Sequence, residues 1–341
     1  MKYTTYFLFL IFASCQNRTF TTLNPPSQNG GEPNLFVSEN NELYLSWVEY
    51  LNDSTDALVY SKLENDEWTD TVEIARGSDW FVNWADFPSF VGYRDGSKRF
   101  AAHWLQKSAE GTYDYDIIVA QSQDGGQIFK KPFILHRDSV AAEHGFVTLL
   151  PLTNDRIFAT WLDGRFTKNE QSAVGSKQSG HGDGAMTLRT AEFDIGGHYF
   201  QEAELDNQIC DCCQTDAAMT SEGVIVVYRD RNEHEIRDIS IVRKVGKEWT
   251  KPHTVHADNW EISGCPVNGP SVDAIDETVA VAWFTAANGV PSVKISFSED
   301  SGKTFGSPVR IDESNPLGRT DVVLISKEKA LVTWLENKDE T

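Results

Sequence analysis

Six segments of this chain repeat one pattern: an extended apolar stretch, a short polar turn, and a second apolar stretch that ends in an aromatic residue. Alternating apolar residues predict β-strands, and turns rich in Asn, Asp and Gly predict hairpins between them. No segment has convincing helical periodicity. The segments read NLFVSENNELYLSWVEY, PSFVGYRDGSKRFAAHWLQ, GFVTLLPLTNDRIFATWLDGR, AAMTSEGVIVVYRDR, PSVDAIDETVAVAWFTA and DVVLISKEKALVTWLEN.

The spacing of these repeats predicts the fold. Their aromatic residues recur every 51 to 67 residues, and a repeat of about 50 residues with several strands is typical of a propeller blade. We therefore predict an all-β, six-bladed β-propeller over residues 31–341. The sixth blade is expected to be incomplete, either because the chain is truncated, which we favour, or because the segment around Phe20 to Leu23 supplies a closing strand. The marker aromatics are Trp47, Trp104, Trp161, Tyr228, Trp283 and Trp334.

A second repeated element follows paired strands: SQDGGQIF at 122–129 and SEDSGKTF at 298–305. The aspartates, Asp124 and Asp300, can accept backbone N–H groups across a tight turn, and the glycines permit a backbone conformation that strains other residues. Both segments resemble the Asp box of the sialidase (neuraminidase) superfamily. The resemblance implies a sialidase-like propeller, in which the box is a structural device without a catalytic residue.

The N-terminus, MKYTTYFLFLIFASC, has Lys2, a short apolar core, and two small residues before Cys15. It resembles a bacterial lipoprotein signal, which predicts a signal peptide over residues 1–15, lipid modification at Cys15 and a linker over residues 16–30. The alternative is an ordinary signal peptide cut near Ala13. Either route exports the chain to a compartment where disulfides can form, and the first anchors it by lipid to a bacterial membrane, at the periplasm or the cell surface.

The charge of the chain excludes some partners. It carries 51 acidic and 30 basic residues, a formal charge of -21. Such a balance disfavours nucleic acid and anionic membrane surfaces as ligands. We expect a monomer that binds a glycan or an anionic small molecule.

Candidate site residues cluster in loops that a propeller gathers on one face, around its central opening. Four arginines and an asparagine are predicted to hold a carboxylate or sulfate, and four acidic residues to supply an acid/base pair for glycoside cleavage. Trp80, Trp84 or Trp260 would provide an apolar surface for a sugar ring. The alternative is an Arg–Asp network that braces the loops, as the alternating charges of YRDRNEHEIRD indicate. The predicted binding residues are Arg165, Arg229, Arg231, Arg319 and Asn268, and the predicted catalytic residues are Asp86, Asp163, Asp230 and Glu235.

The sialidase resemblance covers the catalytic pattern only in part. Sialidases bind a carboxylate through three arginines and use a Tyr–Glu pair with an acidic general acid. Arg229 in SEGVIVVYRDR resembles the second arginine, and Arg319 in GRTD resembles the third, but GGEPNLF stands where a Phe-Arg-Ile-Pro-like motif would carry the first. No tyrosine has the matching context. The leading hypothesis is an exported sialidase-like propeller that acts on or binds glycans, as an exo-sialidase-type glycoside hydrolase or a relative. The alternatives are a metal-binding propeller and a non-catalytic interaction module.

Four cysteines are predicted to share one neighbourhood: Cys210, Cys212 and Cys213 in QICDCCQTD, and Cys265 in the corresponding loop of the next blade. They can form two disulfides, bind copper or zinc with His144 or His181, or form one disulfide beside a reactive thiol pair. Since the chain is exported, we favour the disulfides, which would shape the rim of the opening. No cofactor other than copper or zinc is expected.

Overall fold

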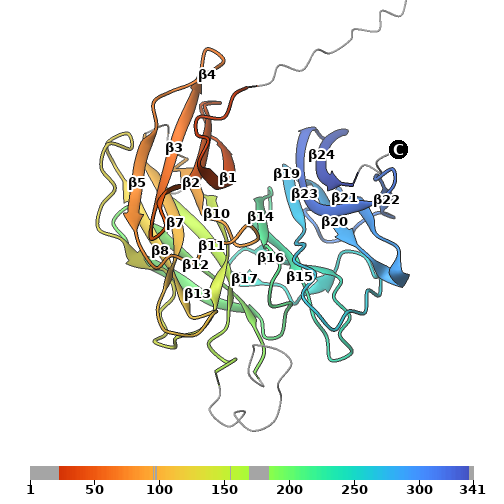
Figure 1. Cartoon of the computed structure of the whole chain (residues 1–341). Helices are drawn as coiled ribbons and strands as arrows, with labels where there is room; N and C mark the ends of the chain where they lie inside the picture. Colours follow the sequence, from red (N-terminus) through yellow and green to blue (C-terminus); the bar gives the residue numbers. More distant parts are fainter. Residues whose placement is uncertain (1–22, 95, 97, 154, 169–183, 338–341) are drawn as a thin grey trace, which may run out of the picture.

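A computed structural model describes residues 23–337 except 95, 97, 154 and 169–183. Within these residues the only helical element is the short 3-10 turn η2 (Ala287–Gly289), and all other regular structure is β. Six antiparallel sheets follow one another along the chain and surround a central space (Figure 1). This arrangement confirms the predicted all-β propeller. The predicted signal peptide, Cys15 and most of the linker lie outside the described residues.

Each of the first three sheets starts with a strand beside the central space and adds strands outward in chain order, except that β4 and β5 of the first sheet both pair with β3. The first contains β1 (Gly30–Val37), β2 (Leu43–Asn52), β3 (Thr55–Glu64), β4 (Glu67–Trp68) and β5 (Val72–Gly77). The second contains β6 (Ser89–Gly92), β7 (Phe100–Lys107), β8 (Tyr115–Ser122) and β9 (Phe133–Ile134). The third contains β10 (His144–Pro151), β11 (Arg156–Asp163), β12 (Thr187–Asp194) and β13 (Tyr199–Asp206).

The remaining sheets continue the same order around the centre. The fourth contains β14 (Asp216–Met219), β15 (Val224–Arg229), β16 (Ile239–Val245), β17 (Glu248–Trp249) and β18 (His253–Thr254). The fifth contains β19 (Ser271–Ile275), β20 (Thr278–Thr285), β21 (Ser292–Ser298) and β22 (Val309–Arg310). The last contains β23 (Pro316–Ser326) and β24 (Lys329–Glu336).

The core lies between neighbouring sheets. The innermost strands contact one another in the order β1, β6, β10, β14, β19 and β23. Five of the six marker aromatics are buried, and Trp161 and Trp283 are among the largest fully buried side chains, whereas Trp334 in the last sheet is half-buried. Burial of a large apolar side chain contributes about 1.5–3 kcal/mol, so the repeat visible in the sequence is also the repeat of the core.

The two Asp-containing segments form the same turn. Ser298 Oγ donates to Asp300 Oδ1 at 2.7 Å, and the same carboxylate oxygen accepts the Thr304 N–H at 2.8 Å. Gly302 has a φ of +79°, which favours glycine. Ser122 and Asp124 repeat the arrangement. Each turn closes the outer end of a blade strand through side-chain hydrogen bonds.

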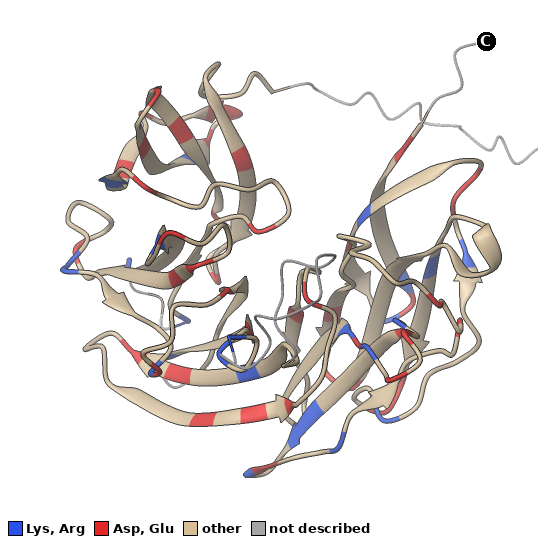
Figure 2. Ribbon diagram, turned by 60° about the horizontal axis from the view of Figure 1, so that its bottom comes forward, with Lys and Arg blue, Asp and Glu red and all other residues tan. Residues whose placement is uncertain are grey.

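The last sheet is two-stranded, as predicted, and stands apart from the first sheet in both views (Figures 1 and 2). Alternate residues of β23 and β24 leave an apolar face exposed: Leu317, Val323, Ile325, Leu331 and Leu335. Leu35 and Val37 of β1 are exposed as well. Among the described residues, none of the helical segments has the length and apolar character needed to cross a membrane.

Candidate active site

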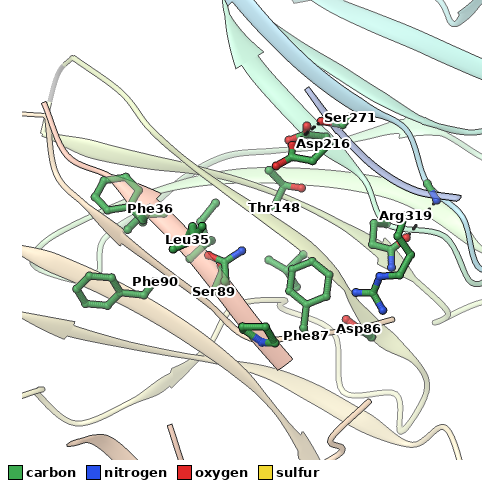
Figure 3. Close-up of a pocket in the computed structure, with 18 of the residues that line it drawn as sticks. Leu35, Phe36, Asp86, Phe87, Ser89, Phe90, Thr148, Asp216, Ser271 and Arg319 are labelled. Carbon is green, nitrogen blue, oxygen red and sulfur yellow. Dashed lines mark hydrogen bonds between the residues drawn. The ribbon is translucent and has the colours of Figure 1, made fainter. Parts of the chain in front are cut away.

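The innermost strands enclose a central cavity of about 780 Å³ (Figure 3). Its walls combine apolar side chains of β1 and β6 with polar side chains from β10, β14, β19 and β23. A concave site with a few convergent polar groups is the usual ligand position of a protein. The polar lining includes Asp86, Ser89, Thr148, Gln214, Thr215, Asp216, Ser271, Arg319, Thr320 and Asp321.

Asp86, Tyr115 and Glu143 form a buried cluster of ionisable side chains, and of these three Asp86 lines the cavity. Asp86 is only 2% exposed and precedes β6. Tyr115 Oη lies 3.0 Å from Asp86 Oδ2 and 3.0 Å from Glu143 Oε1. A phenol hydroxyl has a single hydrogen, so a carboxyl group must supply the second hydrogen bond. Because Asp86 Oδ1 also accepts the Phe146 N–H at 2.6 Å, which favours its charged form, the extra proton belongs on Glu143.

The burial of this cluster changes its proton affinities. Burial raises the pKa of Asp86 to about 7, although the Phe146 N–H and the Tyr115 hydroxyl oppose the change. Burial and the nearby charge of Asp86 raise the pKa of Glu143 well above its usual range. Burial also raises the pKa of Tyr115. A carboxyl group that titrates near neutral pH on a cavity wall is suited to general acid and base catalysis.

The local sequence makes room for Asp86. A Cβ atom at Gly145 would lie 2.0 Å from Asp86 Oδ2, so only glycine fits there. Phe146 has a φ of +53°, an uncommon conformation for a bulky residue that directs its N–H to Asp86. Both features come from the irregular start of β10, where the pairing with β11 shifts between Gly145 and Thr148.

Part of this geometry is a repeated structural device. Asp216 Oδ2 accepts the Val272 N–H at 2.7 Å, and Asp273 Oδ2 accepts the Leu324 N–H at 2.7 Å, each from the next sheet. The bond from Phe146 to Asp86 joins the second and third sheets in the same way. What distinguishes Asp86 is the hydrogen bond to Tyr115 and, through it, the link to Glu143.

Arg319 provides a positive group at the same end of the cavity as Asp86 (Figure 3). Its guanidinium carbon lies 4.7 Å from the ring centroid of Trp84, which is 51% exposed. Among the described residues, no carboxylate lies within ion-pair distance of this guanidinium. Arg319 therefore places a cation on the cavity wall, and Trp84, which does not line the cavity, places an exposed aromatic ring beside that cation. The contact of either residue with a ligand stays a prediction.

Asn268 positions Arg319. Its Oδ1 accepts the Arg319 N–H at 2.8 Å, and its Nδ2 donates to Leu317 O at 3.2 Å. Gly318, with a φ of +94°, permits this close approach, since a Cβ there would lie 2.0 Å from Asn268 Oδ1. The amide of Asn268 is thus engaged with backbone, and the structure gives it a supporting role in place of the predicted contact with substrate.

Asp163 and Arg165 belong to a separate charged cluster that does not line the cavity. Asp163 is fully buried and accepts hydrogen bonds from Arg165 Nε at 2.7 Å and Trp161 Nε1 at 2.9 Å. Burial opposes the effect, but Arg165 lowers the pKa of Asp163 below its usual range. The stacked rings of His136 and His144, 3.7 Å apart, lie beside it. The pairing of Arg165 with Asp163 matches the alternative interpretation, in which an Arg–Asp network braces the loops.

Arg229 is also a brace. The side chain is buried, and its guanidinium donates to three backbone carbonyls: Asn268 at 2.8 Å, Arg237 at 2.6 Å and Phe284 at 2.7 Å. It lies over the Trp260 ring at 4.8 Å. These three carbonyls occupy N–H groups of the Arg229 guanidinium, and Arg229 does not line the cavity. The geometry therefore does not support the predicted contact between Arg229 and a ligand.

The charged residues after β15 pair with one another. Arg231 contacts Glu235 at 2.7 Å and Asp211 at 3.2 Å, and Glu235 also contacts Arg237 at 2.8 Å. Asp230 accepts the Ser240 hydroxyl at 2.8 Å, and burial raises its pKa to about 6. Of the predicted catalytic and binding residues, only Asp86 and Arg319 line the cavity.

Sequence patterns do not reveal Tyr115. It is one of two tyrosines in GTYDYD, and only the pairing of β8 within its sheet determines which one turns inward. Glu143 lies in a loop of the predicted functional face, just before β10. The sequence could therefore predict that Glu143 lies near the site, but it could not predict the contact between Glu143 and Tyr115.

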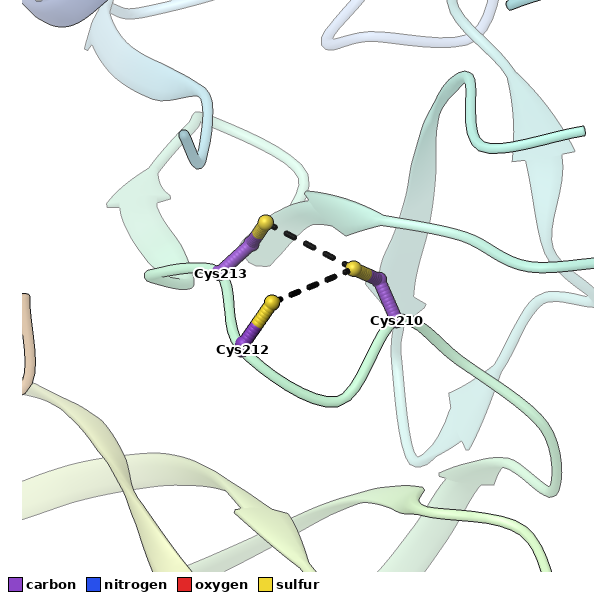
Figure 4. Close-up of side chains that lie close together, drawn as sticks. All are labelled: Cys210, Cys212 and Cys213. Atoms are coloured by element: carbon purple, nitrogen blue, oxygen red, sulfur yellow. Dashed lines mark hydrogen bonds between the residues drawn. The ribbon is translucent and has the colours of Figure 1, made fainter. Parts of the chain in front are cut away.

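The four cysteines beyond residue 200 contain no disulfide in the described structure. Cys210 and Cys213 are buried, Cys212 is half-buried and Cys265 is exposed. Cys210 Sγ lies 3.5 Å from Cys213 Sγ and 4.0 Å from Cys212 Sγ (Figure 4). The predicted neighbourhood is present, whereas His144 lies in the separate cluster around Asp163 and His181 lies outside the described residues.

Comparison with known proteins supports the fold. No protein-family model and no curated protein matches the sequence. A protein of unknown function from Dyadobacter fermentans is 14% identical, with a TM-score of 0.58 and 91% of each chain covered. An ulvan lyase of polysaccharide lyase family PL25 is 11% identical, with a TM-score of 0.55 over 87% of this chain and 72% of that one. The NanB sialidase of Streptococcus pneumoniae is 9% identical, with a TM-score of 0.53 over 87% of this chain and 64% of that one. Identities this low establish a shared fold alone.

Proposed function

We propose that the chain binds an acidic glycan in its central cavity and cleaves a glycosidic bond there, as an exo-acting hydrolase of the sialidase type. The observation that carries this proposal is the cluster of Asp86, Tyr115 and Glu143. It places a carboxyl group that titrates near neutral pH on the cavity wall and connects it to a second, protonated carboxyl group.

Five residues in and around the cavity have roles in this proposal. A sugar ring packs on the exposed Trp84, and Arg319 pairs with the carboxylate or sulfate of the glycan. Asp86, when protonated, gives its proton to the oxygen of the leaving group as the bond from that oxygen to the anomeric carbon breaks. Water supplies the hydroxyl group of the product sugar. Tyr115 then transfers a proton to Asp86 and receives one from Glu143, while the proton that the attacking water releases passes to the solvent, from which Glu143 is protonated again.

The structural neighbours support a glycan as the ligand by analogy. Two of them are named as a sialidase and as an ulvan lyase of a polysaccharide lyase family, so this fold is found in more than one kind of glycan-acting enzyme. The strong negative charge of the chain does not prevent binding of an acidic ligand, because Arg319 forms no ion pair within 4.0 Å among the described residues and feels the Glu32 carboxylate only from a longer distance.

The proposal is tested with a fluorogenic sialoside, a panel of other glycosides and uronate-containing polysaccharides. We expect turnover of an acidic substrate, with loss of at least about 100-fold in Asp86→Asn and a raised KM in Arg319→Ala. Asp300→Asn, in a remote turn, serves as the control. Release of an unsaturated uronate would show elimination in place of hydrolysis. Absence of both turnover and binding on a glycan array would refute the proposal.

We also propose that the chain is exported and anchored by lipid at Cys15, on the motif described above. Metabolic labelling with a fatty acid and fractionation of producing cells test it. The wild-type chain is expected in the membrane fraction with label, and Cys15→Ala is expected to lose both. Label-free wild-type protein would contradict the lipid anchor while leaving the glycan proposal untouched.

A further inference from the structure

The spacing of the sulfur atoms in the loop before β14 fits a bound ion better than a disulfide. The Sγ atoms of Cys210, Cys212 and Cys213 all lie within 4.8 Å of one another (Figure 4). The measured separations from Cys210 are 3.5 and 4.0 Å. Sulfurs joined in a disulfide are about 2.05 Å apart. Two sulfurs that each bind one ion at about 2.3 Å with tetrahedral angles are about 3.8 Å apart.

We propose that Cys210, Cys212 and Cys213 bind a thiophilic metal ion, Zn²⁺ or Cu⁺. Cys265, the exposed cysteine, does not belong to this group of three. Thiolate sulfur selects these two ions over harder cations. Three sulfur ligands leave one position of a tetrahedral site for a further ligand.

The surroundings of the cysteines complement a metal–thiolate centre. Several thiolates around one ion carry excess negative charge. Arg237 Nη1 donates to Cys210 Sγ at 3.2 Å, and Arg237 Nη2 is itself held by Glu235 at 2.8 Å. A hydrogen bond from a cation to a metal-binding sulfur orients that sulfur and offsets its negative charge.

Backbone hydrogen bonds hold the loop in place. The Cys210 N–H donates to Arg229 O at 3.1 Å, and Ile209 pairs with Asp230 across an isolated bridge. Arg229 in turn is fixed by its three carbonyl acceptors. The sulfurs are therefore presented from a loop whose shape does not depend on the ion.

The proposed ion would stabilise the wall of the central cavity. Gln214 directly follows Cys213 and lines the cavity. Its Nε2 donates to Ala85 O at 2.6 Å and its Oε1 accepts the Gly269 N–H at 3.1 Å, which joins the loop to the second and fifth sheets. The ion would fix this residue without contacting a ligand, so the inference stands independently of the glycan proposal.

The test uses the full chain, once as purified and once after anaerobic reduction, with metal content measured by mass spectrometry. We expect about one Zn²⁺ or Cu⁺ per chain, and competition with chelators selective for each ion identifies which one. Cobalt substitution should give thiolate-to-cobalt charge-transfer bands. Cys213→Ser and the half-buried Cys212→Ser should each lower zinc affinity by at least about 100-fold, with circular dichroism to confirm that both variants fold.

His136→Asn is the matched control, because Asp116, His136 and His144 form another group with metal-ligating side chains. This variant should keep the ion. The inference is overturned if the reduced chain binds no zinc or copper, or if peptide mapping finds the four cysteines in disulfides in the purified protein. It is also overturned if His136→Asn loses the ion while Cys213→Ser retains it.

Discussion

At the scale of single residues, the behaviour of Asp86 depends on what surrounds it. The same hydrogen bond to the next sheet is made by Asp216 and Asp273, so an aspartate on an inner strand is by itself a brace. Tyr115 adds a second hydrogen bond and a connection to Glu143. Desolvation of two carboxyl groups around one hydroxyl keeps a proton in the cluster near neutral pH.

Tyr115→Phe should separate these effects. The ring remains in place against Phe81, whose centroid is 4.2 Å away, but Asp86 loses a donor to its charged form and its pKa should rise above about 7. Carboxyl NMR titration measures this directly. On a substrate that is turned over, kcat should fall about 100-fold while KM changes little, because Tyr115 does not line the cavity.

The control for that variant is Tyr113→Phe, two residues earlier in the segment that leads into β8. It should leave the Asp86 titration unchanged. If Tyr115→Phe also leaves it unchanged, the two residues are not coupled and the proposed proton transfer is wrong.

At the scale of elements, the two Asp-containing turns show how much a single side chain contributes. Asp300 accepts the Thr304 N–H and the Thr304 hydroxyl, at 2.8 and 2.7 Å. Asp124 accepts only a backbone N–H at the matching position, because Ile128 replaces the threonine. The turn after β21 is therefore held by one more hydrogen bond than the turn after β8.

Asp300→Ala should lower the free energy of unfolding by about 1 kcal/mol through the loss of these bonds. Asp124→Ala should cost less. Urea denaturation at a single pH measures both. Equal losses, or a larger loss for Asp124→Ala, would show that the threonine hydroxyl adds nothing to the turn.

At the scale of the whole molecule, buried carboxyl groups between the sheets make the stability depend on pH. Burial raises the pKa values of Asp86 and Asp216 to about 7 in the folded chain, whereas an aspartate in the unfolded chain has a pKa of about 3.9. Between these values the folded chain binds more protons than the unfolded chain. The free energy of unfolding therefore falls as the pH rises from about 4 to about 7.

We expect the chain to be more stable at pH 5 than at pH 8, by an amount on the order of a few kcal/mol. Asp216→Asn should reduce the difference, since the asparagine cannot titrate. Asp300→Asn should not, because hydrogen bonds from Thr304 and Ser298 outweigh burial and lower the pKa of Asp300 to about 2. Urea unfolding midpoints measured at pH 5 and pH 8 test this prediction. A wild-type chain that is more stable at pH 8 would contradict the predicted direction of the pH dependence.

The separation of the first and last sheets makes a second prediction at this scale. Ile325 and Leu331 are 58% and 54% exposed on the apolar face of the last sheet, so the chain should bind an apolar fluorescent dye such as anilinonaphthalene sulfonate. Ile325→Glu combined with Leu331→Glu should reduce that fluorescence without unfolding the chain. Val309→Glu, an isolated exposed site on β22, is the control. Unfolding of the double variant would show that this face is buried in solution.

The sequence by itself determined the strands, the turns and the order of the blades, because apolar alternation and turn residues act over short distances along the chain. Marker aromatics such as Trp161 and Trp283 took the core positions that the repeat predicted.

The residues of the candidate site could not be chosen from the sequence in the same way. Arg229 and Arg319 look alike in the sequence. In the structure the Arg229 guanidinium donates to three backbone carbonyls, whereas Arg319 lines the cavity. Asp86, Tyr115 and Glu143 come from separate segments and meet only when the second and third sheets pack together. The packing of distant segments decides which polar groups lose water and which partners they gain, and that balance sets their chemistry.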